Sequence, residues 1–235
     1  MLAHSTTTEV ADTTPKRPIL LVPLGSLEQH GPHLPLNTDT VIATAWADAT
    51  AQQATNTLVA PSVAFGSSGE HQQFAGTISI GTPALTTLLV ELVRSAAHSF
   101  AAVMFLCGHG GNADAVKAAT NTLRLEGHKV LAVFPSWNPL PAPQGFGPID
   151  LHAGRIETSL MLHLAPELVR LDRAEAGNQG GVSELIGPMR DQGVAAVSAN
   201  GVLGDPSGAS ADEGQRLLQD LVSRTVTRVA RLSSV

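Results

Sequence analysis

ILLVPLGSLEQHGPHLPLNTD, residues 19–39, places an apolar run directly before a segment rich in carboxylates and imidazoles. The apolar run, residues 19–24, predicts a buried strand. Residues 28–39 contain two prolines and a glycine, which is typical of a stiff, irregular loop. Such a loop holds its side chains in fixed positions, as the ligands of a metal site require. The candidate ligands in the loop are Glu28, His30, His33 and Asp39.

Strand-like and helix-like segments alternate along the whole chain. Short apolar runs predict the strands, and longer runs with apolar residues at helical spacing predict the helices. The alternation implies a largely parallel sheet with helices on both faces. We expect Thr38 or Asp39 to cap the helix after the first loop. The predicted strands are residues 19–24, 58–65, 101–107 and 129–134, and the predicted helices are residues 40–53, 83–100, 112–126, 157–164 and 212–232.

Length and composition predict a single globular domain. A chain of 235 residues, 43% of them hydrophobic, is long enough to bury a sizeable core. We expect this domain at residues 18–235, after a disordered tail at residues 1–17, which are polar and lack the apolar core of a signal peptide. No apolar run approaches the roughly 18 residues that a membrane span needs, so no membrane partner is expected.

Charge and cysteine content limit the partners and the compartment. The formal net charge of −6 argues against nucleic acid as a partner, because nucleic acid calls for a basic face. The single cysteine, Cys107, excludes an intramolecular disulfide and suits a reducing cytoplasm. Its apolar strand favours a buried, inert thiol over a nucleophile. The chain has no tyrosine, so no tyrosine serves as acid, base or nucleophile.

A second polar cluster, GHGGN at residues 108–112, follows another predicted strand. Ligands of open α/β sheets bind beyond the carboxyl ends of the strands, so His109 and the first loop are expected at the same edge. Imidazoles and carboxylates suit zinc, iron(II) or manganese, and a carboxylate can bridge two such ions. The alternatives are solvated or helix-capping carboxylates and, for residues 108–112, a phosphate-binding loop. That loop lacks the full glycine fingerprint and the lysine of a nucleotide site.

The third cluster, HAGRIETS at residues 152–159, opens a predicted helix after a long loop. Residues 135–148 hold five prolines and two glycines, and long loops in compact domains are usually functional. His152 is a candidate general acid or base, because the pKa of imidazole lies near neutrality. Glu157 is a candidate fifth ligand, a carboxylate that orients an imidazole, or a carboxylate favoured by the helix dipole.

Two further segments give weaker signals. Residues 70–77, EHQQFAGT, are polar and bounded by glycine, so they could line a pocket, although a surface loop is the default expectation. Residues 201–206, GVLGDP, are rich in turn formers, and a plain loop before the last helix is expected there.

These motifs resemble the creatininase family, and the resemblance spans residues 19–232 in the family's order. Within it, residues 64–82, 193–198 and 201–206 are similar to the mycofactocin branch, whose peptidases trim a modified precursor peptide. The motifs that carry the resemblance are LGSLEQHGPHLPL at residues 24–36 with Asp39 after it, GHGGN at residues 108–112, and HAG at residues 152–154 followed by Glu157, Thr158 and Ser159.

The resemblance implies a three-layer α/β/α sandwich with a mainly parallel sheet, assembled as a homohexamer. It implies a centre of one or two divalent metal ions, Fe²⁺ or Zn²⁺ with Mn²⁺ as a further candidate, that hydrolyses C–N bonds. By motif, Asp39 is the expected bridging ligand and His152 the expected proton-transfer residue. The implied metal ligands are Glu28, His30, Asp39 and His109, with Glu157 as a fifth candidate.

The chain departs from the family pattern at Gly111. Creatininase itself has a ligand glutamate there, two residues after the counterpart of His109, so the departure argues against creatinine as substrate and favours Glu157 as the replacement. The expected function is a cytoplasmic metal-dependent peptidase that cleaves the modified C-terminal Val-Tyr pair from the mycofactocin precursor peptide. The alternatives are an amidohydrolase acting on a small cyclic amide or formamide, and a non-catalytic protein that binds a metal or small ligand.

Overall fold

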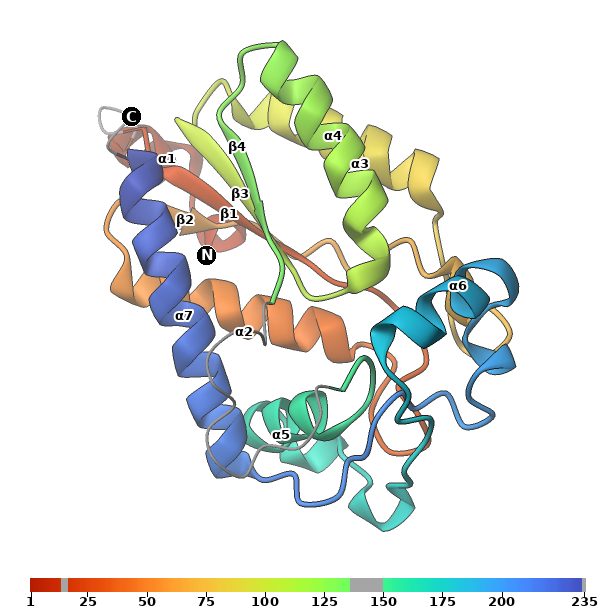
Figure 1. The fold of residues 1–235 in the computed structure, drawn as a ribbon. Coiled ribbons are helices and arrows are strands. Elements are labelled where there is room, and N and C mark those ends of the chain that lie inside the picture. The colour runs from red at the N-terminus through yellow and green to blue at the C-terminus, as the bar shows by residue number, and fades with distance from the viewer. Residues whose placement is uncertain (14–16, 136–149, 234–235) are drawn as a thin grey trace.

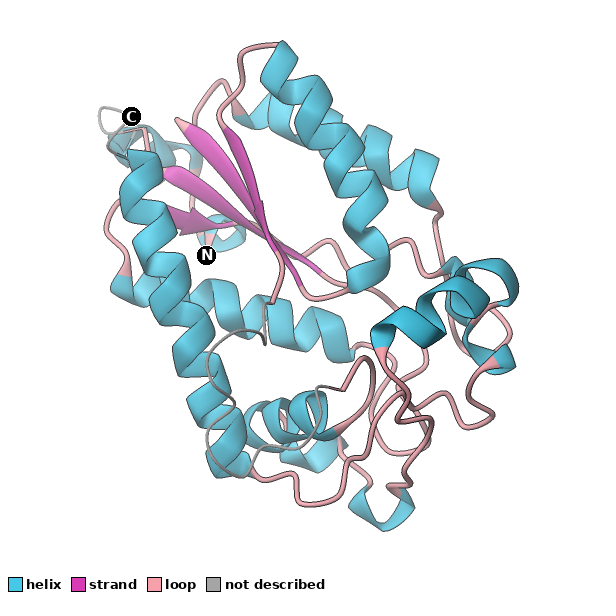
Figure 2. Ribbon diagram, in the orientation of Figure 1, coloured by secondary structure: helices cyan, strands magenta, loops and turns pink. Residues whose placement is uncertain are grey.

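The computed structural model describes residues 1–13, 17–135 and 150–233, and the strands among these residues form one parallel sheet. Its order is β2-β1-β3-β4, and Figure 2 shows the sheet between helices. The central strands β1 and β3 pair over their whole length, from Ile19 opposite Ala102 to Leu24 opposite Cys107. The strands are β1 (Ile19–Leu24), β2 (Thr57–Val59), β3 (Ala102–Cys107) and β4 (Val130–Val133).

Helices cover both faces of the sheet, which confirms the predicted α/β/α sandwich (Figure 1). α3 (Thr82–Ala96) and α4 (Ala113–Leu125) pack on one face, and α2 (Thr38–Gln53) and α7 (Ala211–Ser233) pack on the other. Successive side chains of a strand point to opposite faces. All residues of β1 and β3 are buried, because both faces are covered. Burial on two faces therefore explains the continuous apolar runs in the sequence.

Two more helices extend beyond the sheet and build the site. α5 (Arg155–Leu164) packs against α2 and α7, and it confirms the helix predicted after His152. α6 (Val182–Gln192) was not predicted, because Gly187 and Pro188 near its middle indicate a turn in the sequence. The shorter 3-10 helices are Leu2–His4, Gly69–His71, Gly110–Asn112, Pro166–Leu168, Leu171–Arg173 and Val194–Ala196.

Several predicted boundaries differ from the observed ones, including those of β2 and α2. β2 ends at Val59 rather than at residue 65, because Pro61 has no N–H for the ladder, and the chain rejoins β1 only at the bridge from Leu24 to Val63. α2 begins at Thr38, with Asn37 at its N-cap and no side-chain cap. The predicted capping role of Thr38 or Asp39 is therefore wrong, since both residues lie inside the first turn.

The predicted N-terminal tail has local structure. Within residues 1–17 lie the 3-10 helix Leu2–His4 and helix α1 (Thr7–Thr13), neither of which buries a residue. Thr6 and Glu9 stabilise the start of α1, because the backbone N–H of Thr6 donates to Oε2 of Glu9 and that of Glu9 donates to Oγ1 of Thr6.

The long loop and the search for a membrane span complete the comparison with the sequence. All of the loop predicted at residues 135–148 except Pro135 lies outside the described residues. Among the described helices, none has the length and apolar character needed to span a bilayer.

Candidate metal centre

The predicted ligands meet at the carboxyl edge of the sheet, as strand direction predicts. Glu28 and His30 lie on the loop after β1, and His109 follows β3. Asp39 reaches the same edge because the start of α2 packs closely against the end of β3, where Gly108 leaves room for its backbone. Glu157 arrives from the first turn of α5.

Asp39 lies between two of these histidines. Its Oδ1 is 3.2 Å from Nε2 of His30, and its Oδ2 is 3.4 Å from Nδ1 of His109. The hydroxyl of Ser26 donates a hydrogen bond of 2.6 Å to Oδ2 and holds the carboxylate in place. One carboxylate that faces two imidazoles with different oxygens has the arrangement of a bridging ligand.

Glu28 stands on the His109 side of the centre. Its Oε1 lies 3.0 Å from Nδ1 of His109, and the residue is fully buried. Unless Nδ1 of His109 carries a proton, neither carboxylate oxygen accepts a hydrogen bond from any described residue. Burying an ionised carboxylate is unfavourable unless a positive charge accompanies it, so this residue requires a cation nearby.

Glu157 stands on the His30 side. Its Oε2 lies 3.8 Å from Nε2 of His30 and accepts a hydrogen bond of 2.6 Å from the backbone N–H of Ala153. Ala153 has φ 51°, in the left-handed region that few residues other than glycine adopt. The tight turn before α5 therefore holds this carboxylate against the centre.

Hydrogen bonds determine which nitrogens of His30 and His109 are protonated. Nδ1 of His30 lies 3.2 Å from the carbonyl oxygen of Glu28, and Nε2 of His109 lies 3.1 Å from that of Ser67. A carbonyl oxygen only accepts, so both nitrogens carry hydrogen. The other nitrogen of each ring faces a carboxylate, which also only accepts when ionised. Each ring therefore needs either a second proton or a metal cation on that side.

The pKa values of His30, His109 and Asp39 also indicate that the site favours positive charge beside its carboxylates. Burial lowers the pKa of His30, but the charges of Asp39, Glu157 and Glu28 outweigh burial, and the pKa rises to about 10. Burial likewise opposes the rise at His109, where Glu28, Asp39 and Glu70 bring the pKa to about 10. For Asp39, burial raises the pKa, yet His30 and His109 hold it below its usual range. The donor set of imidazole nitrogens and carboxylate oxygens fits a divalent cation such as Zn²⁺, Fe²⁺ or Mn²⁺.

His152 stands beside this centre. The backbone around His152 pairs with Leu203. The carbonyl oxygen of Leu203 accepts a hydrogen bond from the N–H of Leu151, and the N–H of Leu203 donates to the carbonyl oxygen of His152. Nε2 of His152 donates a 2.7 Å hydrogen bond to the carbonyl oxygen of Gln29, and Nδ1 lies 3.8 Å from Oε1 of Glu28. Burial above all, together with the positive charge of His30, holds the pKa of His152 well below its usual value. His152 is therefore a neutral imidazole whose Nδ1 carries a lone pair.

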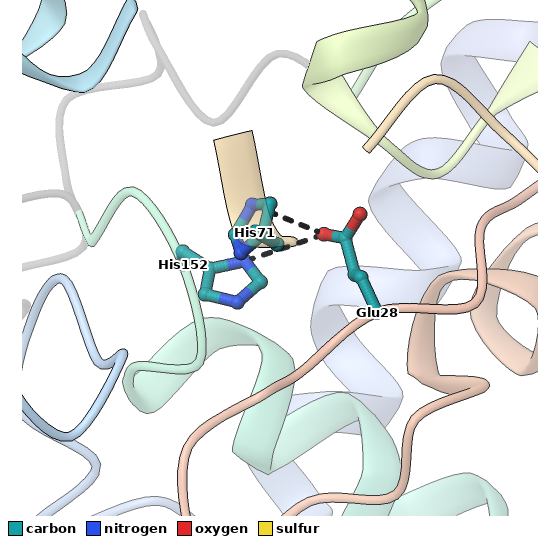
Figure 3. Close-up of side chains that lie close together, drawn as sticks. All are labelled: Glu28, His71 and His152. Atoms are coloured by element: carbon teal, nitrogen blue, oxygen red, sulfur yellow. Dashed lines mark ion pairs between the residues drawn. The ribbon is translucent and has the colours of Figure 1, made fainter. Parts of the chain in front are cut away.

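Residues 70–77 contribute a buried histidine to the site, although a surface loop is the default expectation for this segment. His71 is 3% exposed, and its Nε2 lies 3.5 Å from Oε1 of Glu28 (Figure 3). The signal that could have found it is the sheet-edge argument, since this loop also follows a predicted strand. Residues 201–206 also do more than expected of a plain loop, because Leu203 holds His152.

Glu70 fills the space that Gly111 leaves empty. A Cβ built on Gly111 would lie 2.2 Å from Oε1 of Glu70 and 2.4 Å from Nε2 of His109. Oε1 of Glu70 is 3.6 Å from Nε2 of His109. Glu157, by contrast, lies beside the other histidine, His30. The carboxylate nearest to position 111 is thus Glu70, which is not among the ligands predicted from the sequence.

Two neighbouring polar residues support the centre from outside. Nε2 of His33 lies 2.8 Å from Oγ1 of Thr158, in the first turn of α5, as suits a supporting role for His33. Asn112 is fully buried and ties the loop ends together. Its Nδ2 donates to the carbonyl of Gly25 at 2.9 Å, and its Oδ1 accepts from the N–H of Ser67 at 2.8 Å.

The centre opens into a cleft of about 870 Å³. Its lining includes three of the candidate ligands, Asp39, His109 and Glu157, together with residues of α6 and the residue after it. A cleft of this size accommodates a ligand much larger than a single ring. The residues of α6 that face it include Ile186, Met189 and Arg190.

Comparisons with known proteins agree with one another. The model of the family described as "Creatininase: Creatinine amidohydrolase" matches residues 3–229. The "Mycofactocin precursor peptide peptidase" of Mycobacterium tuberculosis (strain CDC 1551 / Oshkosh) is 48% identical over 241 residues, covering 98% of this chain and 90% of the relative. The "Creatinine amidohydrolase" of Pseudomonas putida is 34% identical over 176 residues, covering 66% of this chain and 67% of the relative.

Solved structures show the same fold. The structure named "Creatininase Mn" superposes with a TM-score of 0.81 at 28% identity, covering 98% of this chain and 97% of the other. A mutant creatininase of "Zn-Zn type" gives a TM-score of 0.80 at 27% identity, covering 98% of this chain and 96% of the other.

Proposed function

The chain belongs to the creatininase family, and from this premise we propose that it is a metal-dependent peptidase acting on the modified precursor peptide of mycofactocin. The observation that carries the hydrolase assignment is the placement of Asp39 between His30 and His109, beside the fully buried carboxylate of Glu28. The peptide substrate is supported by relatives of that name, which are 47–48% identical over 91–98% of this chain.

The described residues offer ligands for two cations. Glu28, Asp39 and His109 would hold one, with ligand atoms within 4.8 Å of one another. His30, Asp39 and Glu157 would hold the second. We propose Fe²⁺ or Zn²⁺, with Mn²⁺ also suited to these ligands. When bound, such ions lower the pKa of water and polarise a carbonyl group.

His152 supplies the proton transfers of the reaction. The lone pair on its Nδ1 accepts a proton from the attacking water, whose oxygen forms a bond to the carbonyl carbon. The C–N bond then breaks, and the same nitrogen returns the proton to the leaving amine. The hydrogen bond from Nε2 to the carbonyl of Gln29 keeps Nδ1 directed at the centre throughout. Cleavage before the valine of the modified Val-Tyr pair would release the cross-linked core.

The cleft favours a peptide over a small ring. Its volume of about 870 Å³ exceeds what creatinine or a formamide would fill. The side chains of Ile186 and Met189 offer apolar contacts for a peptide that extends away from the centre. Catalysis is also favoured over a purely structural metal site, because a structural site is closed to substrates.

We also propose that the chain is cytoplasmic and forms a homo-oligomer, a hexamer by family resemblance. The single buried cysteine suits a reducing compartment. The net charge of −6 supports the view that nucleic acid is not a partner.

Cleavage of the modified precursor tests the proposal. Purified protein is loaded with Fe²⁺, Zn²⁺ or Mn²⁺ and incubated with modified precursor, unmodified precursor, creatinine and formamides, and products are identified by mass spectrometry. We expect a shortened peptide and the cross-linked fragment from modified precursor alone. Turnover of creatinine or a formamide instead would establish the small-amide alternative. A metal-replete protein that cleaves none of these substrates would contradict the peptidase assignment.

A further inference from the structure

Gln29 lies buried between His71 and His152, and its side-chain amide has one possible orientation. The backbone N–H of Gly31 donates to Oε1 of Gln29 at 2.8 Å, so this end of the amide is the oxygen. The other end is the nitrogen, which donates to the carbonyl oxygen of Gly201 at 3.1 Å. Both contacts agree, and together they exclude the flipped amide.

This orientation determines the protonation of His71. Nε2 of Gln29 lies 2.8 Å from Nδ1 of His71, and an amide nitrogen only donates. Nδ1 of His71 therefore accepts, and the hydrogen of the neutral ring is on Nε2. This Nε2 lies 3.5 Å from Oε1 of Glu28 (Figure 3), and His71 lines the cleft.

The same residue determines the opposite form of His152. The backbone carbonyl of Gln29 accepts the N–H on Nε2 of His152 at 2.7 Å, which leaves a lone pair on Nδ1. The 3.0 Å contact between Nε2 of Gln29 and Nε2 of His152 is consequently no hydrogen bond, because both nitrogens carry hydrogen. The two protons of the amide are already donated to His71 and Gly201.

The two rings present a donor and an acceptor to one small space. The ligand atoms of His71, His152 and Glu28 lie within 4.8 Å of one another, and the rings are 4.5 Å apart between centroids. Amide hydrolysis has matching needs there, since the substrate oxygen gains negative charge during attack while the attacking water must lose a proton.

We propose that His71 is a second catalytic residue, a neutral N–H donor to the developing oxyanion, and that Gln29 is the positioning residue that fixes His71 as donor and His152 as acceptor. This inference rests on the proposed amide hydrolysis. Because the donor is fixed before the reaction, it needs no reorganisation as charge develops. The packing around Gln29 is tight, since a Cβ on Gly201 would lie 2.0 Å from Oε1 of Gln29.

A merely structural alternative assigns the N–H of His71 to the support of Glu28 as a metal ligand. The two roles differ in what they affect. A donor to the oxyanion changes kcat and leaves cation affinity unchanged, whereas a support for Glu28 changes cation affinity first.

The test combines spectroscopy, metal binding and kinetics on zinc-loaded protein. The variants are His71→Ala, Gln29→Glu and the control His98→Asn, which removes an exposed histidine outside the cleft. Gln29→Glu has nearly the same shape but accepts hydrogen where glutamine donates, so it moves the hydrogen of His71 from Nε2 to Nδ1. Histidine ¹⁵N shifts report the tautomers, zinc competition reports affinity, and cleavage of the modified precursor reports kcat and KM.

We expect wild-type ¹⁵N shifts with hydrogen on Nε2 of His71 and of His152. His71→Ala and Gln29→Glu should each lower kcat by about 10²- to 10³-fold, the usual effect of removing one oxyanion donor, with zinc affinity and KM within about threefold of wild type. Hydrogen on Nδ1 of wild-type His71, a Zn²⁺–Nε2 bond, or unchanged kcat in His71→Ala would overturn the inference. Loss of zinc affinity in His71→Ala would establish the structural role instead. If wild-type protein cleaves no amide, the proposed function fails, whereas the tautomers are still tested by the ¹⁵N shifts.

Discussion

A Cβ built on Gly108 would lie 2.5 Å from the carbonyl oxygen of Asp39, so the end of β3 and the start of α2 are in direct backbone contact. This contact brings the candidate bridging carboxylate to within reach of His109, the residue after Gly108. The distance between two parts of the metal centre therefore depends on the absence of a side chain at position 108.

Gly108→Ala should displace Asp39 and weaken cation binding. The added methyl group must push α2 away, at a cost of about 1–3 kcal/mol in unfolding free energy, and we expect at least a tenfold loss in cation affinity. Gly110→Ala is the matched control in the same motif, because a Cβ there meets no atom within 4 Å. Thermal unfolding and isothermal titration measure both effects. Equal behaviour of the two variants would contradict the role assigned to Gly108.

Asp39→Asn and Glu157→Gln should differ in metal stoichiometry. Asp39 faces both His30 and His109, so its replacement should weaken both cation sites by at least about 10-fold. Glu157 faces His30 and not His109. Glu157→Gln should therefore weaken the cation site at His30 and leave the site at His109 unchanged. Equilibrium dialysis with elemental analysis counts the ions per chain. A Glu157→Gln variant that loses both ions would argue against separate sites.

Cation binding should release protons near neutral pH. The pKa values of His30 and His109 rise to about 10 in the metal-free protein, so both rings are protonated at pH 7. A metal binds only the deprotonated nitrogen of each ring. Cation affinity should therefore increase as the pH is raised to about 10, where both rings lose their second proton. Titration calorimetry in buffers of different ionisation enthalpy counts the released protons.

The control for this measurement is His152→Gln. The pKa of His152 is well below its usual value, so the ring is already neutral at pH 7 and should contribute no proton. The number of protons released should therefore be the same as in wild type. A binding heat that is independent of the buffer would contradict the prediction for His30 and His109.

Cys107 should be inert in the folded protein. The residue is fully buried in β3, and burial raises the pKa of its thiol, so the reactive thiolate is scarce at pH 8. We expect labelling by a disulfide reagent only after unfolding in denaturant, at one equivalent per chain. Rapid labelling of the native protein would show that β3 is exposed.

His152→Gln should retain metal and lose turnover. The lone pair on Nδ1 is lost, while the predicted ligand set is unchanged. We expect kcat to fall by about 10²- to 10⁴-fold, the usual contribution of a general acid–base residue, with normal ion content by elemental analysis. Activity that survives this substitution would exclude the proton-transfer role.

The sequence predicts most of the fold because the central strands are unusually clear. The apolar runs in β1 and β3 arise from burial on two faces, and the alternation with helices leads directly to a parallel sheet. α6 escapes because Gly187 and Pro188 locally resemble a turn, although packing of Leu185 against Leu203 stabilises the helix. The local sequence contains the turn-forming residues but gives no indication of the tertiary contact with Leu203.

The site is predictable where a motif follows a clear strand. Glu28, His30, Asp39 and His109 follow β1 and β3, and the structure brings them together. His71 follows β2, which ends at Val59, so its loop resembles ordinary surface sequence. The tautomers that Gln29 imposes could not be predicted, because they depend on contacts with residues far along the chain.

The pairing of β1 with β3 also determines the spacing of the ligands. Leu24 and Cys107 are opposite one another at the ends of the two strands, four residues before Glu28 and two before His109. A slip of one residue in this pairing would move one loop by about 3.3 Å along the strand. This shift is larger than the 3.0 Å between Oε1 of Glu28 and Nδ1 of His109. Cation affinity in this protein is therefore a sensitive measure of strand register, and a misregistered sheet would be recognised by its failure to take up metal.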